Sequence, residues 1–225
     1  HVTFGVVTIG IHDQRWKVEA SGFNGRAPDE RRTDLDLGRF DSVAGRVSFL
    51  ATPRLALQAS AGRLRDATSD FLIRSPRPFV RSTASAMYHR PLGAGGLWAS
   101  TVALGVTQAQ EVVATGPFTA TSGGALAESR LTLADRHSVF VRAELLRMAG
   151  HHLHAHEYSR TMFVLGKAQL GYVRHLHSRG GLVPGIGASL AVSLLPELLA
   201  PRYGGRWPPS VGVFLNLRPR QHVME

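Results

Sequence analysis

The segment with the most evident chemistry is HHLHAHE at positions 151–157. It contains five possible metal ligands, His151, His152, His154, His156 and Glu157. Imidazole nitrogens and carboxylate oxygens bind Zn²⁺, Cu²⁺ and Ni²⁺. On an extended ribbon, His152, His154 and His156 would project to the same side. The segment predicts a metal site in a loop, with a histidine-rich polar loop that binds no ion as the alternative.

Catalytic patterns are weak in this sequence. It has no cysteine, no G-x-S-x-G and no H-E-x-x-H, so the usual nucleophile and zinc-protease signatures are missing. Ser85 and His89 share one face of a strand-like segment, but four residues on a strand span about 13 Å. GAGG at 93–96 lacks the lysine and the helix of a phosphate loop. The sequence therefore predicts a protein that is not an enzyme and has no bound cofactor.

The elements that would carry these residues are β-strands. Eleven segments alternate apolar side chains with small or polar ones, which is the two-residue period of a strand. Helical spacing fits only 182–199, where Pro184, Gly185 and Gly187 argue against a helix. The predicted strands are Val2–Ile9, Gln14–Phe23, Asp41–Leu50, Arg54–Arg65, Phe79–Arg90, Gly96–Thr107, Gly124–Leu133, Ser138–Met148, Thr161–Val173, Leu182–Leu195 and Ser210–Arg218.

The charged residues inside the predicted strands favour one face. A charge at the lipid-facing midplane of a membrane barrel costs about 2–4 kcal/mol, so charges are expected on a polar inner face, the lumen. A lumen richer in basic than acidic side chains predicts a preference for small anionic solutes. The predicted lumen charges are Lys17, Glu19, Arg46, Arg81, Glu128, Arg130, Arg142, Glu144, Lys167 and Arg218. Glu128, Arg130, Arg142 and Glu144 are expected to form opposite-charge pairs across a turn.

The connections between the segments alternate in length. Short ones at 10–13, 51–53, 91–95, 134–137 and 174–181 alternate with long ones at 24–40, 66–78, 108–123, 149–160 and 196–209. This order is typical of an up-and-down membrane barrel, with short periplasmic turns and long outer loops. Greek-key crossovers in a soluble sandwich would break it.

Aromatic residues support the same interpretation. Five aromatic residues lie close to the short connections and on the apolar parity, that is, at the alternate strand positions that carry the apolar side chains. They are Trp16, Phe49, Tyr88, Trp98 and Tyr172. Amphipathic rings prefer the depth of the lipid headgroups. A girdle of rings near the turns is therefore expected if the strands cross a bilayer.

Several segments resemble a group of uncharacterised bacterial outer-membrane-type β-barrel proteins. They are HVTFGVVTIG at 1–10, RWKVEASGFNGRAPDE at 15–30, LDLGRFDSVAGRVSF at 35–49, LALQASAGRL at 55–64 and HRPLGAGGLWAS at 89–100. Members of this group are generally longer at the N-terminus, and the resemblance supplies no catalytic motif. Single-chain bacterial barrels have even strand numbers. Eleven strands therefore predict the C-terminal part of a barrel of 12 or more strands.

The predicted fold is an all-β, antiparallel up-and-down transmembrane β-barrel forming a single domain over residues 1–225. We expect a porin-like or structural protein of the bacterial outer membrane, with the lipid bilayer as its partner. The formal net charge is +10, but no arginine cluster forms a nucleic-acid surface, so no nucleic-acid partner is expected. The alternatives are a metal-handling outer-membrane protein that uses residues 151–157, and a soluble ligand-binding β-barrel.

Overall fold

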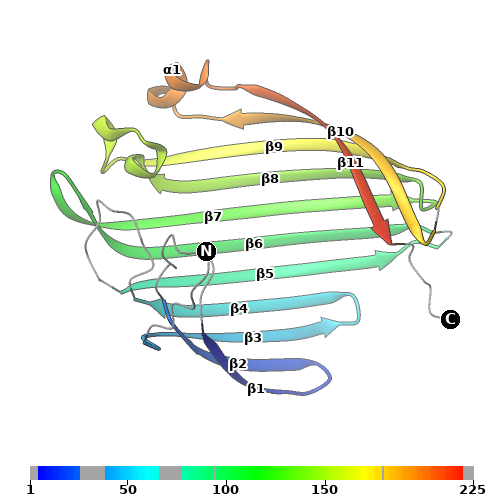
Figure 1. Cartoon of the computed structure of the whole chain (residues 1–225), viewed down its shortest axis with the longest axis horizontal. Helices are drawn as coiled ribbons and strands as arrows, with labels where there is room; N and C mark the ends of the chain where they lie inside the picture. The colour runs from blue at the N-terminus through cyan, green and yellow to red at the C-terminus, as the bar shows by residue number, and fades with distance from the viewer. Residues whose placement is uncertain (1–4, 26–38, 66–77, 94, 179, 220–225) are drawn as a thin grey trace. The chain divides into compact units, whose positions relative to one another are not determined.

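A computed structural model describes residues 5–25, 39–65, 78–93, 95–178 and 180–219. Nearly all of the regular structure is β, and consecutive strands are neighbours in the sheet (Figure 1). The strands are β1 (Val6–His12), β2 (Trp16–Phe23), β3 (Ser42–Thr52), β4 (Leu55–Leu64), β5 (Phe79–Pro91), β6 (Leu97–Val113), β7 (Gly116–Leu133), β8 (His137–Ala149), β9 (Met162–His175), β10 (Leu182–Leu194) and β11 (Pro209–Pro219).

The sheet is an eleven-stranded meander in the order β1 to β11. Strand pairing is antiparallel, as in β2 with β3, where Trp16 lies opposite Phe49 and Glu19 opposite Arg46. The eleven predicted strands and their sequential arrangement are confirmed. In the described part of the chain, β1 and β11 end the strand order and no pairing between them closes the sheet.

One predicted connection is wrong. Residues 108–123 were expected to form a long loop, but β6 continues to Val113 and β7 starts at Gly116. Only a two-residue turn separates them. The polar residues of this stretch lie on extended strands, and Gly116 supplies a backbone φ of 104° next to the turn. The strict alternation of short and long connections is therefore broken at this hairpin.

Two of the other long connections contain short helices. The one between β8 and β9 holds the 3₁₀ helices η1 (Gly150–Leu153) and η2 (His156–Tyr158), and the one between β10 and β11 holds η3 (Glu197–Leu199) and α1 (Ala200–Tyr203). The predicted connections at 24–40 and 66–78 lie mostly outside the described residues. The start of the strand predicted from Val2 lies outside them as well. No helix in the described ranges is both long and apolar enough to cross a membrane.

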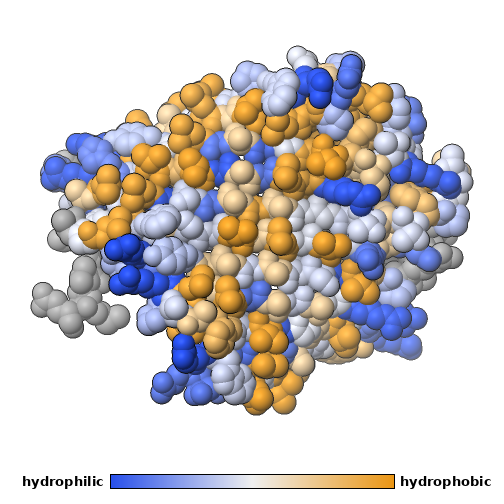
Figure 2. Space-filling view, turned by 180° about the vertical axis from the view of Figure 1, so that it is seen from behind, coloured by the Kyte–Doolittle hydropathy of each residue, from blue (hydrophilic) through white to orange (hydrophobic). Residues whose placement is uncertain are grey.

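The apolar face of the strands is exposed. On β9 and β10, exposed residues alternate with buried ones, so Leu170 and Leu190 are 54% and 63% exposed while their neighbours Gly171 and Ser189 on the opposite face are buried. Hydrophobic side chains are visible at the surface in Figure 2. Exposed members of the predicted apolar parity include Val43, Val47, Phe49, Leu57, Val102, Leu104, Val139, Val141, Leu145, Val164, Ile186, Val211, Val213, Leu215 and Leu217. This arrangement is the inverse of a soluble core.

The chain divides into two compact units. The first comprises His1–Ala86, Ala103–Ala125 and Leu146–Val164, and the second comprises Met87–Val102, Leu126–Leu145 and Leu165–Glu225. The first unit holds β1–β4 complete and the 3₁₀ helices η1 and η2. The second holds β10, β11 and the β7–β8 turn. Each carries groups of polar side chains that are considered below.

The predicted girdle aromatics are partly exposed and engage one another. In the first unit Trp16 and Phe49 are register partners, 40% and 44% exposed. In the second unit the rings of Tyr88 and Trp98 meet edge to face with centroids 5.2 Å apart. Such pairs contribute about 0.5–1.5 kcal/mol beyond their buried area. Tyr172, 42% exposed, has its hydroxyl 2.7 Å from Nδ1 of His137.

Candidate functional site

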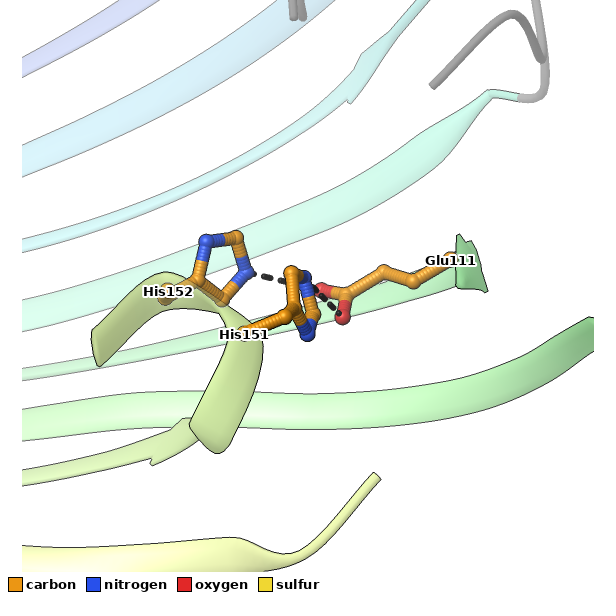
Figure 3. Close-up of side chains that lie close together, drawn as sticks. All are labelled: Glu111, His151 and His152. Carbon is orange, nitrogen blue, oxygen red and sulfur yellow. Dashed lines mark hydrogen bonds and ion pairs between the residues drawn. The ribbon is translucent and has the colours of Figure 1, made fainter. Parts of the chain in front are cut away.

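A carboxylate and two imidazoles converge in the first unit (Figure 3). Nε2 of His151 lies 3.1 Å from Oε2 of Glu111, and Nε2 of His152 lies 3.2 Å from Oε1 of the same carboxylate. The three ligand atoms all lie within 4.8 Å of one another. Two side chains of this His–Glu cluster are mostly buried, with Glu111 13% and His151 12% exposed, whereas His152 is 40% exposed.

The His–Glu cluster depends on the turn that follows β8. Gly150 begins η1, and its amide donates to the carbonyl of Thr161 at 2.9 Å. A side chain at Gly150 would collide with the Tyr158 backbone and would come within 3.1 Å of the Phe163 ring. Because His154 then adopts a left-handed conformation with a φ of 55°, the chain turns sharply. His151 and His152, both in η1, contact Glu111 near the end of β6.

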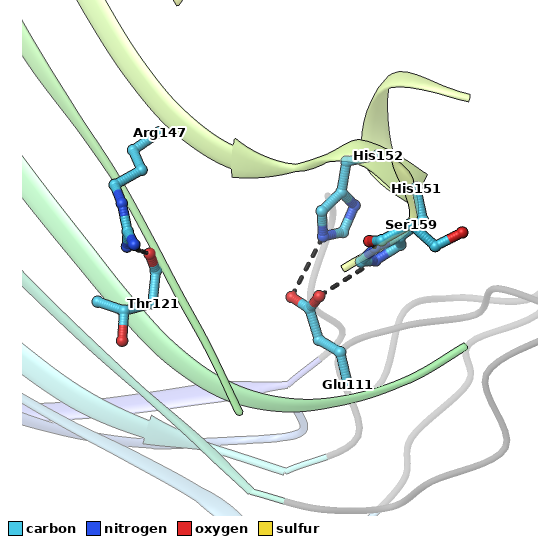
Figure 4. Close-up of polar contacts among 6 residues, drawn as sticks. All are labelled: Glu111, Thr121, Arg147, His151, His152 and Ser159. Carbon is cyan, nitrogen blue, oxygen red and sulfur yellow. Dashed lines mark hydrogen bonds and ion pairs between the residues drawn. The ribbon is translucent and has the colours of Figure 1, made fainter. Parts of the chain in front are cut away.

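His151 is held in a defined tautomer. Its Nδ1 lies 3.1 Å from the carbonyl oxygen of Ser159 (Figure 4). A carbonyl can only accept, so Nδ1 carries the hydrogen and donates it. In the neutral imidazole, Nε2 then presents its lone pair to Oε2 of Glu111. Both of these atoms are buried and lie 3.1 Å apart, so a proton or a metal ion between them would contact both.

The predicted loop ligands are only partly brought together. The segment is wound into two 3₁₀ helices, so the expectation of an extended ribbon is wrong. His154 and His156 have ring centroids 6.3 Å apart, but they and Glu157 belong to no group of three ligands among the described residues. Sequence reasoning missed Glu111, which lies 40 positions before His151 in the stretch interpreted as a loop. Spacing along the chain carries no signal for that contact.

Predicted lumen charges of the first unit form a compact ion-pair group. Glu19 lies 3.1 Å from Nζ of Lys17 and 2.7 Å from Nη2 of Arg46. Arg46 is its register partner on β3, so this is a cross-strand pair. Arg81 donates from Nε to Oγ1 of Thr107 at 3.1 Å. These contacts lie on the polar face of the strands.

In the second unit one of the expected cross-turn pairs forms, between Arg142 and Glu128, whereas Arg130 has other partners. Arg142 contacts Glu128 across strands at 3.5 Å and also pairs with Glu144 on its own strand. Arg130 instead donates from Nη2 to Oγ of Ser138 at 3.1 Å and lies 3.2 Å from Nε2 of His175. Arg218 donates to the carbonyl of Asp135, and Lys167 is exposed.

Aromatic rings occupy the polar face of the second unit. Phe140 and Phe214 have centroids 6.3 Å apart, and they rest against Gly171 and Gly187, where any side chain would overlap them. A cavity of about 480 Å³ lies beside these rings, lined also by Glu128, Arg130 and Arg142. The described polar face is therefore partly filled by side chains.

A serine and a histidine also meet in the second unit. Oγ of Ser138 lies 3.0 Å from Nε2 of His175 and 2.8 Å from Oγ1 of Thr132. Ser138 is 0% and His175 2% exposed. A nucleophile must reach a substrate carbonyl, and this serine is enclosed. The pair is a buried polar network that links β7, β8 and β9.

A fluorophosphonate probe is therefore expected to leave the folded protein unlabelled. Labelling can be followed by intact-mass spectrometry, with a known serine hydrolase treated in parallel. A stoichiometric adduct that disappears in Ser138→Ala would show that the serine is reactive, and would contradict the structural role.

Comparisons with known proteins define the class of fold. The chain resembles a solved porin structure, refined at 1.8 Å resolution, with a TM-score of 0.56 and 13% sequence identity. The similarity covers 95% of this chain and 61% of the porin chain. No family model and no curated protein sequence matches the chain. The architecture is therefore an antiparallel, porin-like meander, and the chain spans about three fifths of the porin's length.

Proposed function

We propose that this chain belongs to a channel-type β-barrel of the bacterial outer membrane. The observation that carries the proposal is the exposed apolar parity along an antiparallel, porin-like meander. Contiguous apolar surface of this kind needs a covering medium, and lipid covers the outside of a membrane barrel. The partly exposed aromatics next to short turns suit the headgroup region.

The polar face supports passage of small anionic solutes. Its predicted charges comprise seven basic and three acidic residues. The three acidic residues all have basic partners, through Lys17, Arg46 and Arg142. Lys167 is exposed at mid-strand on β9. A water-filled path along this face would therefore have a positive potential and would favour anions.

Planar-bilayer recording tests the proposal on the full-length protein purified in detergent. Discrete conductance steps are expected, with a reversal potential in a KCl gradient that indicates chloride preference. Heat-modifiable mobility on gels is expected as well. An absence of current, or selectivity for cations, would contradict the proposed channel. Stability without detergent would instead favour a soluble ligand-binding barrel.

Reversing the charge of Lys167 is expected to weaken the anion preference. In Lys167→Glu the reversal potential should move toward the equilibrium potential of K⁺, because one positive charge on the polar face becomes negative. Arg202→Glu is the matched control, since it makes the same charge change in the α1 helix between β10 and β11. Equal shifts in the two variants would mean that the effect is general surface charge and that Lys167 does not line the path.

A further inference from the structure

We propose that Glu111, His151 and His152 form a binding site for Zn²⁺ or a similar divalent transition-metal ion. The inference stands whether or not the protein conducts ions. Two imidazoles and one carboxylate are a common zinc ligand set, with a fourth position left for water. Residues from distant parts of the sequence supply these ligands, so the site is distinct from the histidine-rich segment taken alone.

The spacing of the ligand atoms suits a tetrahedral ion. With Zn–N and Zn–O distances of about 2.0–2.1 Å, two ligands of a tetrahedral zinc lie about 3.3 Å apart. The two imidazole nitrogens lie 3.1 and 3.2 Å from different oxygens of the Glu111 carboxylate, and the three ligand atoms lie within 4.8 Å of one another. Small side-chain rotations would therefore bring the three atoms around one ion.

The electrostatics of the cluster also favour a cation. The Ser159 carbonyl fixes the hydrogen of His151 on Nδ1, so the Nε2 lone pair of the neutral ring faces a carboxylate oxygen. A bound cation would convert both of these acceptors into ligands. A histidine that donates its second nitrogen to a carbonyl is the usual outer-shell arrangement at metal sites.

A metal ion can reach the cluster through His152. This side chain is 40% exposed and lines a cavity of about 400 Å³ together with Arg81, Thr107 and Arg147. Arg147 donates to the carbonyl of Thr121 (Figure 4). His151, in contrast, packs against the edge of the Phe118 ring with centroids 6.0 Å apart. One ligand is thus fixed and another accessible.

Isothermal titration of the full-length protein in detergent with Zn²⁺ tests the site. One ion per chain is expected for the wild type. Glu111→Gln and His152→Gln each remove a direct ligand, so each should weaken binding by more than the roughly 10–100-fold that loss of an outer-shell partner costs. His152→Gln changes a half-exposed side chain, so folding should be retained. Co²⁺ should give the visible absorption of a tetrahedral complex, and this absorption should be lost in both variants.

Two matched controls distinguish this site from metal binding by the histidine-rich segment or by any surface carboxylate. The double variant His154→Ala, His156→Ala and the remote carboxylate variant Glu197→Gln should bind Zn²⁺ like the wild type. If the double variant abolishes binding while Glu111→Gln retains it, the histidine-rich segment itself is the site and the proposal is wrong. Absence of Zn²⁺ binding to the folded wild type would also overturn it, leaving an imidazolium–carboxylate ion pair.

Binding should also stabilise the fold. A ligand at 100 times its dissociation constant adds about 2.7 kcal/mol to the free energy of unfolding. Zn²⁺ should therefore raise the midpoint of thermal unfolding in the wild type, and a chelator should reverse the change. The midpoint of Glu111→Gln should not respond to Zn²⁺.

Discussion

Replacing Leu170 with arginine is expected to lower the free energy of unfolding in lipid vesicles by about 2–4 kcal/mol. Leu170 is near the middle of β9, 54% exposed, and lies opposite Leu190 on β10. If this face contacts hydrocarbon, the guanidinium loses its hydration. Urea titration followed by tryptophan fluorescence measures the change.

The neighbouring position provides the control for this experiment. Gln169 points to the opposite face, where its Nε2 donates to Oγ of Ser189 at 3.0 Å. Gln169→Arg loses one hydrogen bond, which is worth about 1 kcal/mol. The result would contradict a lipid-facing surface if both variants lower the free energy of unfolding by less than about 1 kcal/mol, or if Leu170→Arg leaves it unchanged. The apolar face would then be exposed to water, as in a soluble barrel. Surface changes in soluble proteins are usually within about 0.5 kcal/mol.

The strands were predictable because their signal is local. The alternation along Val43 to Phe49 and along Ile186 to Leu194 repeats every two residues, and each segment carries it independently. Pro184 and the nearby glycines excluded a helix, and β10 is a strand. The error at 108–123 arose because this stretch has polar residues on both faces of its strands. Without an apolar face, its sequence resembles that of a loop. Hydropathy alone does not distinguish these two cases.

The contacts within the candidate sites were not predictable in the same way. Glu111 and His151 meet because a 3₁₀ turn redirects the chain after β8, and this geometry has no two-residue period. The partner of Arg130 was also missed, because His175 lies 45 positions away and the nearer Glu128 pairs with Arg142. Opposite charges near a turn indicate that a pair can form, but not which side chains form it.

Gly171→Ala is expected to lower the free energy of unfolding by about 1–3 kcal/mol, the usual cost of an overpacked site. Gly171 is buried on the polar face of β9. Its three nearest neighbours are all atoms of the Phe140 ring, and the third of them, Cε2, would lie only 2.8 Å from a new Cβ. The ring has limited room to withdraw because Phe214 packs beside it. Urea unfolding in vesicles measures the loss.

A double-mutant cycle identifies the cause of that loss. Phe140→Leu removes the ring and leaves space for the added methyl group, so Gly171→Ala should cost less in this background, with a coupling of about 0.5–3 kcal/mol. Gly45→Ala is the matched control, because its nearest neighbour would be 3.8 Å away in another strand. If Gly45→Ala and Gly171→Ala lower the free energy of unfolding equally, the loss comes from the backbone conformation of glycine and not from contact with the Phe140 ring. The polar face around Gly171 would then be an open channel wall that the ring does not fill.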